Sequence, residues 1–407
     1  MNAPDGVNLM ANTSVLGLAI PVLPVTWLLG PAVSYVLLVT LGLAGTAAAW
    51  YWVLSHGFGL SRVAAFVGGG FCGFAPAMLS HASWHPNIIS QFLVPFIVWR
   101  AVLMGRNGRW FRDGVVLALL VVWQAFINEE ILLFTAWAVG VFVVLYGVQR
   151  WRVVRGRVRG FVAGLCVTGV VAGGLLAYPL WVQFFGPQSY SGIAGLLNIY
   201  YVDLASYFIY SQQSLANWFF PNPLLAPNYA EQNAFFGWFL VPTLVAAVVT
   251  LWNEVVVRSL AAVAAMFGAF SLGDVVLFNG RETGIPGPWL FFQELPLLHS
   301  VVPTRFGLIV TAVFGVILAI MTNEVLAITG RYRLPGYISW GLALALVLVP
   351  LIPTQLVMTE RPDVPKFIIA GEWRPYLAGG RTLVPVPLAD TNRPEGMRWA
   401  AATNIGF

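Results

Sequence analysis

Apolar runs of about twenty residues, the length that crosses a membrane as a helix, recur along this chain and constrain its fold more than any other feature. A helix rises about 1.5 Å per residue, so each run spans a hydrocarbon layer about 30 Å thick. Only 9% of the 407 residues are charged, whereas soluble domains average roughly 25%. The sequence therefore predicts an all-α membrane protein and excludes a water-soluble globule.

Ten such runs can be placed, which predicts a polytopic transmembrane helical bundle. They cover residues 32–54, 61–80, 88–103, 114–127, 131–148, 160–184, 237–257, 260–279, 306–328 and 337–353. Residues 14–30 are also apolar, but Pro21 and Pro24 favour an interfacial or re-entrant segment over a full span.

The spans divide the chain into five regions. These are an outer loop with the re-entrant segment (1–31), six spans (32–184), a long outer loop (185–236), four spans (237–353) and a short outer tail (354–407). The tail is interpreted as the incomplete start of a soluble domain, because too few residues remain to build a core.

Arginines fall mainly on one side of these spans, which predicts the orientation of the chain. Thirteen lie on that side: Arg62, Arg100, Arg106, Arg109, Arg112, Arg150, Arg152, Arg155, Arg157, Arg159, Arg258, Arg331 and Arg333. Before the tail, only Arg281 and Arg305 lie on the other side. Cytoplasmic loops retain positive charge, so we expect a multi-pass plasma-membrane protein whose N-terminus and tail lie on the outer face.

The net charge of +5 is explained by this asymmetry and does not indicate a nucleic-acid partner. The arginines occupy short gaps between spans and form no basic stripe. Cys72 and Cys166 lie in apolar runs without disulfide or zinc spacing. The excess of Arg over the single Lys366 is typical of a GC-rich bacterial genome.

The strongest candidates for a catalytic site are two adjacent carboxylates, Glu129 and Glu130. They lie in the outer turn between the fourth and fifth spans. Neighbouring carboxylates repel, which raises the pKa of one of them and suits a proton acceptor or a divalent metal site. We predict that they are catalytic and that Asn128 lines a substrate groove bounded by the outer loops. The alternative is a solvated turn in which one Glu caps the following helix.

His81 and His85 lie in the outer turn between the second and third spans. Four residues apart, they would share a face of a continuous helix, but Pro86 predicts that the helix ends there. They form either a metal-binding pair or a loop with hydrogen-bonded histidines, and we predict that both line the groove.

Arg305 lies at the outer mouth of the ninth span, close to His299. A guanidinium binds phosphate through paired hydrogen bonds, so Arg305 is predicted to bind a lipid-linked phosphate, with His299 lining the groove. The alternative is an arginine that reaches ordinary lipid phosphate. Arg281 is a second phosphate candidate, or forms a surface pair with Glu282.

Two other acidic residues are candidates. Glu231 lies just before the seventh span and either lines the groove or caps the helix. Asp5 is the only acidic residue before the first span and is a third catalytic candidate, although Pro4 and Gly6 also suit a simple turn.

Four glycines within the second predicted span are interpreted as positions of close helix packing. They are Gly68, Gly69, Gly70 and Gly73. Small residues let helices approach one another, and no nucleotide-binding glycine pattern accompanies these four.

Several stretches resemble the glycosyltransferase C superfamily, a class of integral membrane glycosyltransferases. They are PAVSYVLLVTLGLAGTAAAWYWV from Pro31, SRVAA from Ser61, FAP from Phe74, and the block that begins LP at Leu295 and ends RF at Phe306. Together with the long outer loop, the resemblance covers most of residues 1–353.

The resemblance implies an enzyme that takes a sugar from a polyprenyl phosphate and transfers it to a cell-envelope glycan, lipid or protein on the outer face. It implies an inverting displacement in which Glu129 or Glu130 is the base and Arg305 stabilises the phosphate. Membrane lipids are the other expected partners, and a divalent metal is the one cofactor considered.

One departure from the superfamily concerns the catalytic acid, which there lies in the first outer loop after a transmembrane helix. By this resemblance we expect the chain to begin midway through that loop, and Asp5 does not clearly match the motif. We therefore expect a sequence that is incomplete at both ends.

Two other functions stay open at this stage. A transporter or flippase of a lipid-linked saccharide needs a similar groove, and a non-catalytic assembly subunit needs no base. A transport pathway is expected to place ionisable residues in mid-span, whereas here they gather at the outer rim, which favours a transferase.

Overall fold

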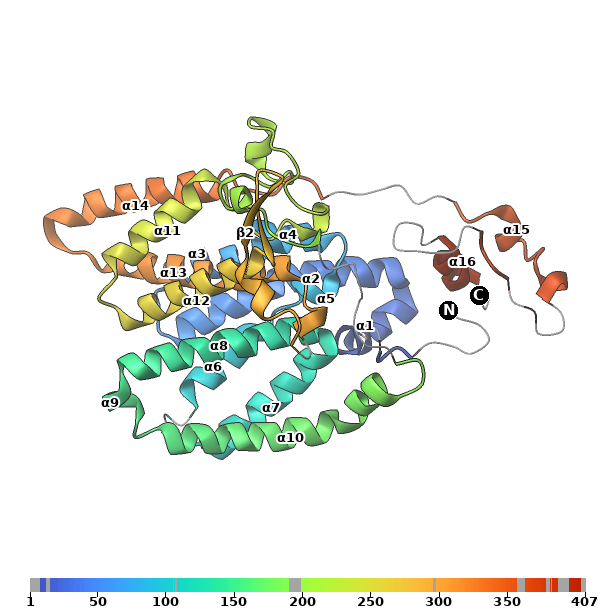
Figure 1. The fold of residues 1–407 in the computed structure, drawn as a ribbon, viewed down its shortest axis with the longest axis horizontal. Helices are drawn as coiled ribbons and strands as arrows, with labels where there is room; N and C mark the ends of the chain where they lie inside the picture. Colours follow the sequence, from blue (N-terminus) through green and yellow to red (C-terminus); the bar gives the residue numbers. More distant parts are fainter. Residues whose placement is uncertain are drawn as a thin grey trace. The chain divides into compact units, whose positions relative to one another are not determined.

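The computed structural model describes residues 8–11, 15–104, 106, 108–189, 199–295, 298–356, 363–377, 381, 383–386 and 395–403 (Figure 1). The chain divides into two compact units. The larger comprises residues 15–177 and 192–357, and the smaller comprises 1–14, 178–191 and 358–407.

The larger unit is a bundle of α-helices, which confirms the predicted all-α class. Its helices are α1 (Leu16–Leu29), α2 (Pro31–Trp52), α3 (Arg62–Phe74), α4 (Pro76–Ala82), α5 (Pro86–Ile89), α6 (Val94–Leu103), α7 (Trp110–Ile127), α8 (Glu129–Gln149), α9 (Trp151–Val154), α10 (Val158–Phe185), α11 (Gly237–Thr250), α12 (Val255–Ser271), α13 (Phe306–Ala327) and α14 (Arg333–Leu348). A π-helical turn, η1 (Val53–Gly57), extends α2. The connections contain short 3-10 turns: η3 (Leu204–Phe208), η4 (Leu215–Trp218), η5 (Tyr229–Glu231), η6 (Pro288–Phe291), η7 (Leu298–Ser300), η8 (Pro303–Arg305) and η9 (Gly330–Tyr332).

The smaller unit contains the end of α10, α15 (Lys366–Ile369), η10 (Arg374–Leu377) and α16 (Glu395–Thr403). The side-chain amide of Asn8 donates hydrogen bonds of 2.9 Å to the carbonyls of Val182 and Pro187. These contacts tie residues near the chain start to the end of α10.

Six helices among the described residues are long and apolar enough to cross a membrane. They are Pro31–Gly57, Pro86–Leu103, Trp110–Ile127, Glu129–Gln149, Val158–Phe185 and Pro303–Ala327. α3 and α4, bent by 41° at their junction, add a seventh if they form one broken span. The prediction of a helical membrane protein is supported. By the length and composition of the described helices there are six or seven spans, so the predicted ten are not confirmed.

The predicted spans 237–257 and 260–279 have wrong boundaries. α11 ends at Thr250, α12 begins at Val255 and ends at Ser271, and β1 (Val275–Phe278) then pairs antiparallel with β2 (Arg281–Pro286). Asn279 and Gly280 between the strands have φ angles of 51° and 76°. An Asn-Gly pair favours this left-handed backbone at a two-residue hairpin turn, so the chain turns there instead of continuing as a helix.

Buried Asp203 holds this hairpin. Its Oδ1 accepts a hydrogen bond of 2.9 Å from the amide of Asn279, and its Oδ2 accepts one of 2.6 Å from the amide of Gly280. Asp203 therefore has a clear structural role.

An aromatic cluster packs where α8, α12 and α13 meet. The ring of Phe306, the first residue of α13, lies 4.6 Å from Phe134 and 4.9 Å from Trp289, between ring centroids. Phe267 of α12 lies 5.5 Å away. Buried aromatic rings contribute large apolar contacts, so this cluster fixes the start of α13, directly after Arg305.

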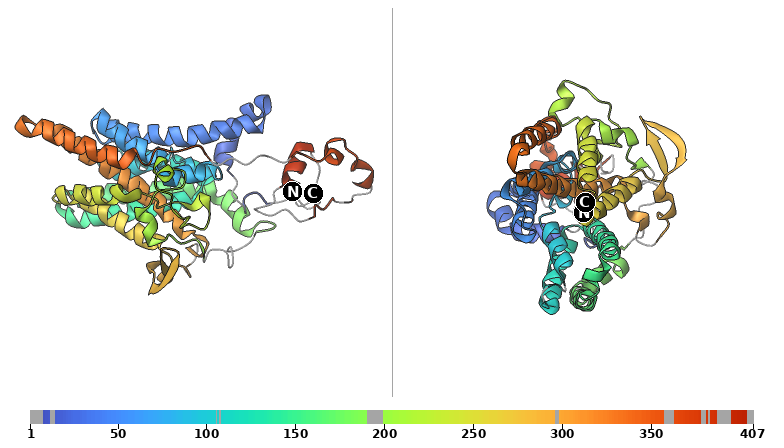
Figure 2. Two further views of the ribbon diagram at one scale, coloured as in Figure 1. Left: turned by 90° about the horizontal axis from the view of Figure 1, so that it is seen from above. Right: turned by 90° about the vertical axis from the view of Figure 1, so that its left-hand side faces the viewer.

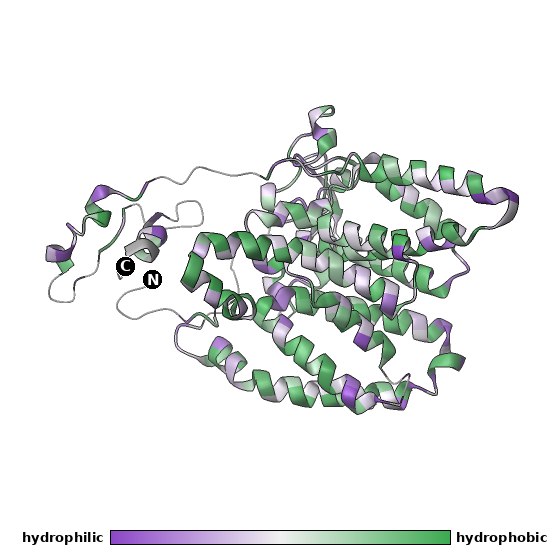
Figure 3. Cartoon of the chain, turned by 180° about the vertical axis from the view of Figure 1, so that it is seen from behind, coloured by the Kyte–Doolittle hydropathy of each residue, from purple (hydrophilic) through white to green (hydrophobic). Residues whose placement is uncertain are grey.

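Charged residues gather at the ends of the helices, and hydrophobic residues cover most of their length (Figure 3). Every Asp, Glu, Lys and Arg in the described α-helices lies within about one turn of a helix end. The Arg-bearing connections α6–α7, α8–α10 and α13–α14 lie at one end of the bundle, on the left of Figure 1, together with the first turn of α12, which carries Arg258. The first turns of α8 and α13 lie at the opposite end.

Glycines allow α3 to pack closely between α2 and α13, seen among the blue and orange helices of Figure 2. A Cβ atom added at Gly68 would lie 2.6 Å from the carbonyl oxygen of Gly315 on α13. One added at Gly69 would lie 2.7 Å from the carbonyl oxygen of Ala47 on α2, and Gly73 also faces α2. The packing interpretation is confirmed for these three positions. A Cβ atom added at Gly70 would meet nothing within 4 Å, so Gly70 does not share the role.

We expect Gly69→Ala to lower the free energy of unfolding by about 1–3 kcal/mol, because the added methyl group forces two backbones apart. Unfolding of the detergent-solubilised protein measures this effect. Gly70→Ala is the matched control on the next residue and should leave stability unchanged or slightly raised. Equal effects of the two substitutions would contradict the packing role of Gly69.

Candidate functional site

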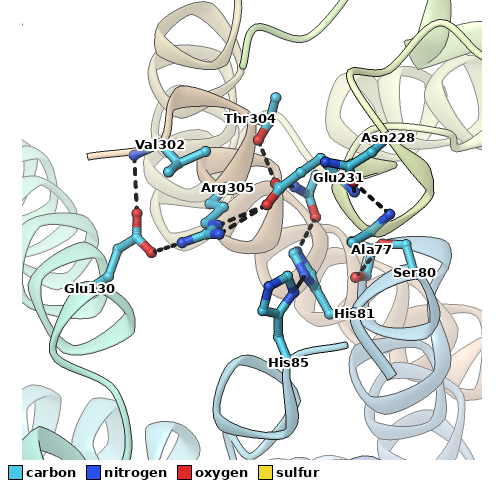
Figure 4. A network of polar contacts seen from close by, with 12 residues as sticks. Ala77, Ser80, His81, His85, Glu130, Asn228, Glu231, Val302, Thr304 and Arg305 are labelled. Atoms are coloured by element: carbon cyan, nitrogen blue, oxygen red, sulfur yellow. Dashed lines mark hydrogen bonds and ion pairs between the residues drawn. The ribbon is translucent and has the colours of Figure 1, made fainter. Parts of the chain in front are cut away.

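Three segments distant in sequence meet in an ionic cluster at the bundle end opposite the Arg-bearing connections (Figure 4). Nη1 of Arg305 donates a hydrogen bond of 2.6 Å to Oε2 of Glu130. Nε and Nη2 of Arg305 donate to Oε1 of Glu231 at 3.1 and 3.0 Å. The guanidinium therefore bridges two carboxylates.

Arg305 is positioned by the start of α13. It ends the 3-10 turn η8, whose first residue is Pro303, and Phe306 beside it is anchored in the aromatic cluster. Pro suits the first position of such a turn because it has no N–H to satisfy. Three of the five N–H groups of an arginine are directed at carboxylates here, and two remain for another partner.

Glu231 is the most deeply buried charged residue of the cluster, with 3% of its surface exposed. It ends the turn η5, in which the amides of Ala230 and of Glu231 itself donate to the side chain of Asn228. Its Oε2 accepts hydrogen bonds from Oγ1 of Thr304 at 2.6 Å and from Nδ2 of Asn233 at 2.8 Å. Every oxygen of this carboxylate is therefore paired.

The environment of Glu231 favours its ionised form. Burial by itself raises the pKa of this carboxyl, but the positive charge of Arg305 and the hydrogen bonds from Thr304 and Arg305 outweigh it and hold the pKa below its usual value. Glu231 is a carboxylate at neutral pH.

Glu130 and Glu129 lie in the first turn of α8, where the helix dipole favours negative charge. The capping residue is Asn128, whose side chain accepts a hydrogen bond of 2.9 Å from the amide of Ile131. Oε1 of Glu130 accepts another, of 3.1 Å, from the amide of Val302. Glu130 is thus held on both oxygens, whereas Glu129 is exposed.

His81 and His85 extend the cluster toward α4. The helix ends at Ala82, as Pro86 predicts, yet the two rings meet, with 3.0 Å between their Nδ1 atoms. Nε2 of fully buried His81 lies 2.9 Å from Oδ1 of Asn233. The interpretation of hydrogen-bonded histidines is confirmed.

His85 is neutral at physiological pH. Burial lowers the pKa of its ring, and the positive charge of Arg305 lowers it further, against a smaller opposing effect of Glu231. With neutral histidines, two carboxylates and one guanidinium leave the cluster with one net negative charge.

The sequence-predicted residues are only partly brought together. Glu130, Glu231, Arg305, His81 and His85 share the cluster, with Asn128 beside it. Arg281 lies on exposed strand β2, and His299 is exposed in η7. Asp5 lies outside the described residues.

Two members of the cluster, Asn233 and Thr304, are absent from the sequence-based set. Each is adjacent or nearly adjacent in sequence to a residue in that set, Glu231 or Arg305. Neither has an ionisable side chain, so a search for charged groups passes over both. Their shared partner, Oε2 of Glu231, is apparent only in three dimensions.

An apolar cleft of about 800 Å³ begins one helical turn below the cluster and extends toward the Arg-bearing end. Its lining along α13 runs from Ile309 to Glu324, a length of about 22 Å at 1.5 Å per residue. α6, α8 and α12 supply other walls, including Val94, Ala138 and Val263. The cleft has the dimensions and chemistry to hold a hydrocarbon chain.

Within the described part of the chain, no three His, Cys, Asp or Glu side chains are grouped so as to hold a metal ion. In the cluster, moreover, Arg305 lies between Glu130 and Glu231, where a cation would otherwise bind.

Arg305→Met should lower the free energy of unfolding by about 3–5 kcal/mol, because it leaves the buried charge of Glu231 uncompensated. Unfolding in detergent measures the change. In the double variant Arg305→Met/Glu231→Gln that charge is absent, so the loss should be smaller than the sum of the two single losses. Arg281→Met, on the exposed strand, should stay within about 0.5 kcal/mol of wild type. Strict additivity would show that Arg305 and Glu231 are not coupled.

No protein-family model matches this sequence, and no curated protein matches it either. What the site can do is therefore inferred from its own side chains and their surroundings.

Proposed function

We propose that this chain is a membrane glycosyltransferase that moves a sugar from a polyprenyl-phosphate donor to an acceptor hydroxyl on the outer face of the bacterial plasma membrane. The observation that carries the proposal is the pairing of a polar, partly open cluster around Arg305 with an apolar cleft that starts one turn below it. A lipid-linked sugar has these two halves, a phosphate-sugar head and a long hydrocarbon chain. The resemblance to the glycosyltransferase C superfamily points the same way.

The proposed topology has ten spans. α11, α12 and α14 are shorter than the six longest apolar helices, and with the bent pair α3–α4 they bring the total to ten. The positive-inside tendency puts the Arg-bearing end in the cytoplasm, so the cluster faces outward.

The reaction we propose is an inverting displacement at the anomeric carbon. The acceptor oxygen forms a bond to that carbon while the bond to the phosphate oxygen breaks, and the polyprenyl phosphate leaves with the electron pair. Phosphate is a good leaving group, so the site needs a base for the hydroxyl proton and a cation for the developing charge. Arg305 has two N–H groups to offer the phosphate, and Glu129 is an exposed carboxylate in the first turn of α8, beside Glu130.

A transporter of lipid-linked saccharides fits the described helices less well. Translocation of a charged head group requires polar or ionisable groups along the path. All Asp, Glu, Lys and Arg side chains of the described α-helices lie near helix ends.

Transfer should be measurable with the purified full chain in lipid nanodiscs, radiolabelled polyprenyl-phosphate sugars and a cell-envelope extract as acceptor. Glu130→Gln and Arg305→Ala should reduce the rate by about 10²-fold or more, because Arg305 is aimed at the developing charge on the phosphate and Glu130 orients Arg305. Glu129→Gln tests the exposed carboxylate. Arg331→Ala at the opposite end is the control and should retain full activity. Absence of transfer from every donor, or transfer unaffected by all three site variants, would refute the proposal.

The proposed sidedness predicts which positions a membrane-impermeant maleimide reaches in intact cells. In a chain with Cys72 and Cys166 replaced by Ala, Glu282→Cys on β2 should be labelled and Thr329→Cys between α13 and α14 should not. Both native side chains are exposed in the structure, so accessibility of the residue itself does not bias the result. The reverse labelling pattern would show that the cluster faces the cytoplasm.

A further inference from the structure

Hydrogen bonds link Glu231 to His85 through Asn233 and His81. The direction of each bond follows from which groups can donate a proton. Ionised Glu231 only accepts, so the amide nitrogen of Asn233 faces it, at 2.8 Å. The amide oxygen of Asn233 therefore faces His81 and accepts from it, at 2.9 Å. His81 carries its proton on Nε2.

The same reasoning extends to the second histidine. His81 is fully buried and close to Arg305, and charging a buried ring is costly, so the ring is neutral and its Nδ1 bears a lone pair. That lone pair accepts the proton of Nδ1 of His85 across 3.0 Å. A neutral His85 with its proton on Nδ1 has a free lone pair on Nε2.

Nε2 of His85 is open to a ligand. Among the described residues it has no hydrogen-bond partner, and it is not one of the enclosed, unpaired polar atoms. The side chain is partly exposed, at the edge of the cluster (Figure 4).

We infer that His85 is the general base of the transfer, with Nε2 taking the proton of the acceptor hydroxyl. This inference rests on the proposed function. The proton moves from the hydroxyl to Nε2 as the oxygen–carbon bond forms and the carbon–phosphate-oxygen bond breaks. The proton then leaves His85 for solvent. Glu231, Asn233 and His81 are positioning residues that fix the tautomer and orientation of His85, as a buried carboxylate does for a catalytic histidine.

The charges around His85 suit this role. The charged groups that act on it are Arg305 and Glu231, and the neutral ring of His81 touches it. Before reaction His85 is neutral and able to accept a proton. After proton uptake, its positive charge balances the one net negative charge of the cluster. Glu130 is less suited as a base, because both its oxygens already accept hydrogen bonds.

The position of the proton can be tested without any substrate. Diethyl pyrocarbonate acylates the unprotonated nitrogen of a neutral imidazole, and peptide mass spectrometry of the full chain in nanodiscs reports each histidine. We expect His85 to react at a rate comparable to that of exposed His299, and His81 to be protected. Asn233→Leu interrupts the series of hydrogen bonds from Glu231 to His85. In this variant the difference in acylation rate between His81 and His85 should become smaller. An unreactive His85 beside a reactive His299 would overturn the inference.

The catalytic role is tested by His85→Gln and His85→Ala. Gln retains a hydrogen-bond donor toward His81, so the midpoint temperature of unfolding should be unchanged. Its amide cannot accept a proton at neutral pH, so kcat should fall by about 10²–10⁴-fold. Added imidazole should restore part of the activity of His85→Ala, and His299→Ala should be fully active. Full activity of His85→Gln in a chain whose wild type transfers sugar would overturn the inference and leave the proposed function standing. If wild type transfers no sugar, the proposed function fails, whereas the acylation pattern still reports the lone pair on Nε2.

Discussion

The bridge from Arg305 to Glu130 and Glu231 is the interaction on which the end of the bundle where α8 and α13 begin depends. A charge taken out of water is costly unless it is paired and hydrogen-bonded. Glu231 meets that requirement with four donated hydrogen bonds, from Arg305, Thr304 and Asn233. The start of α8, the turn η5 and the start of α13 must therefore meet in one arrangement.

This arrangement has a consequence for chemistry. Because Glu231 is saturated by donors, it orients Asn233, which orients His81, which in turn orients His85. An interaction that satisfies a buried charge also determines which nitrogen atom at the edge of the cluster bears a lone pair. Stability and reactivity thus have a common origin in one carboxylate.

Much of the fold could be predicted because its signals are local. Apolar length predicts helices, Pro86 predicts a helix end, and Gly68, Gly69 and Gly73 predict close packing. The hairpin at Asn279–Gly280 also has a local signal, the Asn-Gly turn, but the apolar run VVLF before it predicts the end of span 260–279. A short apolar run fits a strand or a helix equally well, and the hydrogen bonds from Asn279 and Gly280 to Asp203, 76 and 77 residues earlier, stabilise the turn.

The sequence by itself determined the class of the protein, the asymmetry of its arginines and the ionisable residues from which a site could be built, since these follow from composition and short-range spacing. Only the tertiary structure decided which of those residues meet. Arg305 lies 175 positions from Glu130 and 74 from Glu231, and hydrogen bonds across such separations leave no periodic trace. Asn233 and Thr304 acquire their roles solely from the shared oxygen of Glu231, and the lone pair of His85 follows from the directions of the bonds that begin there.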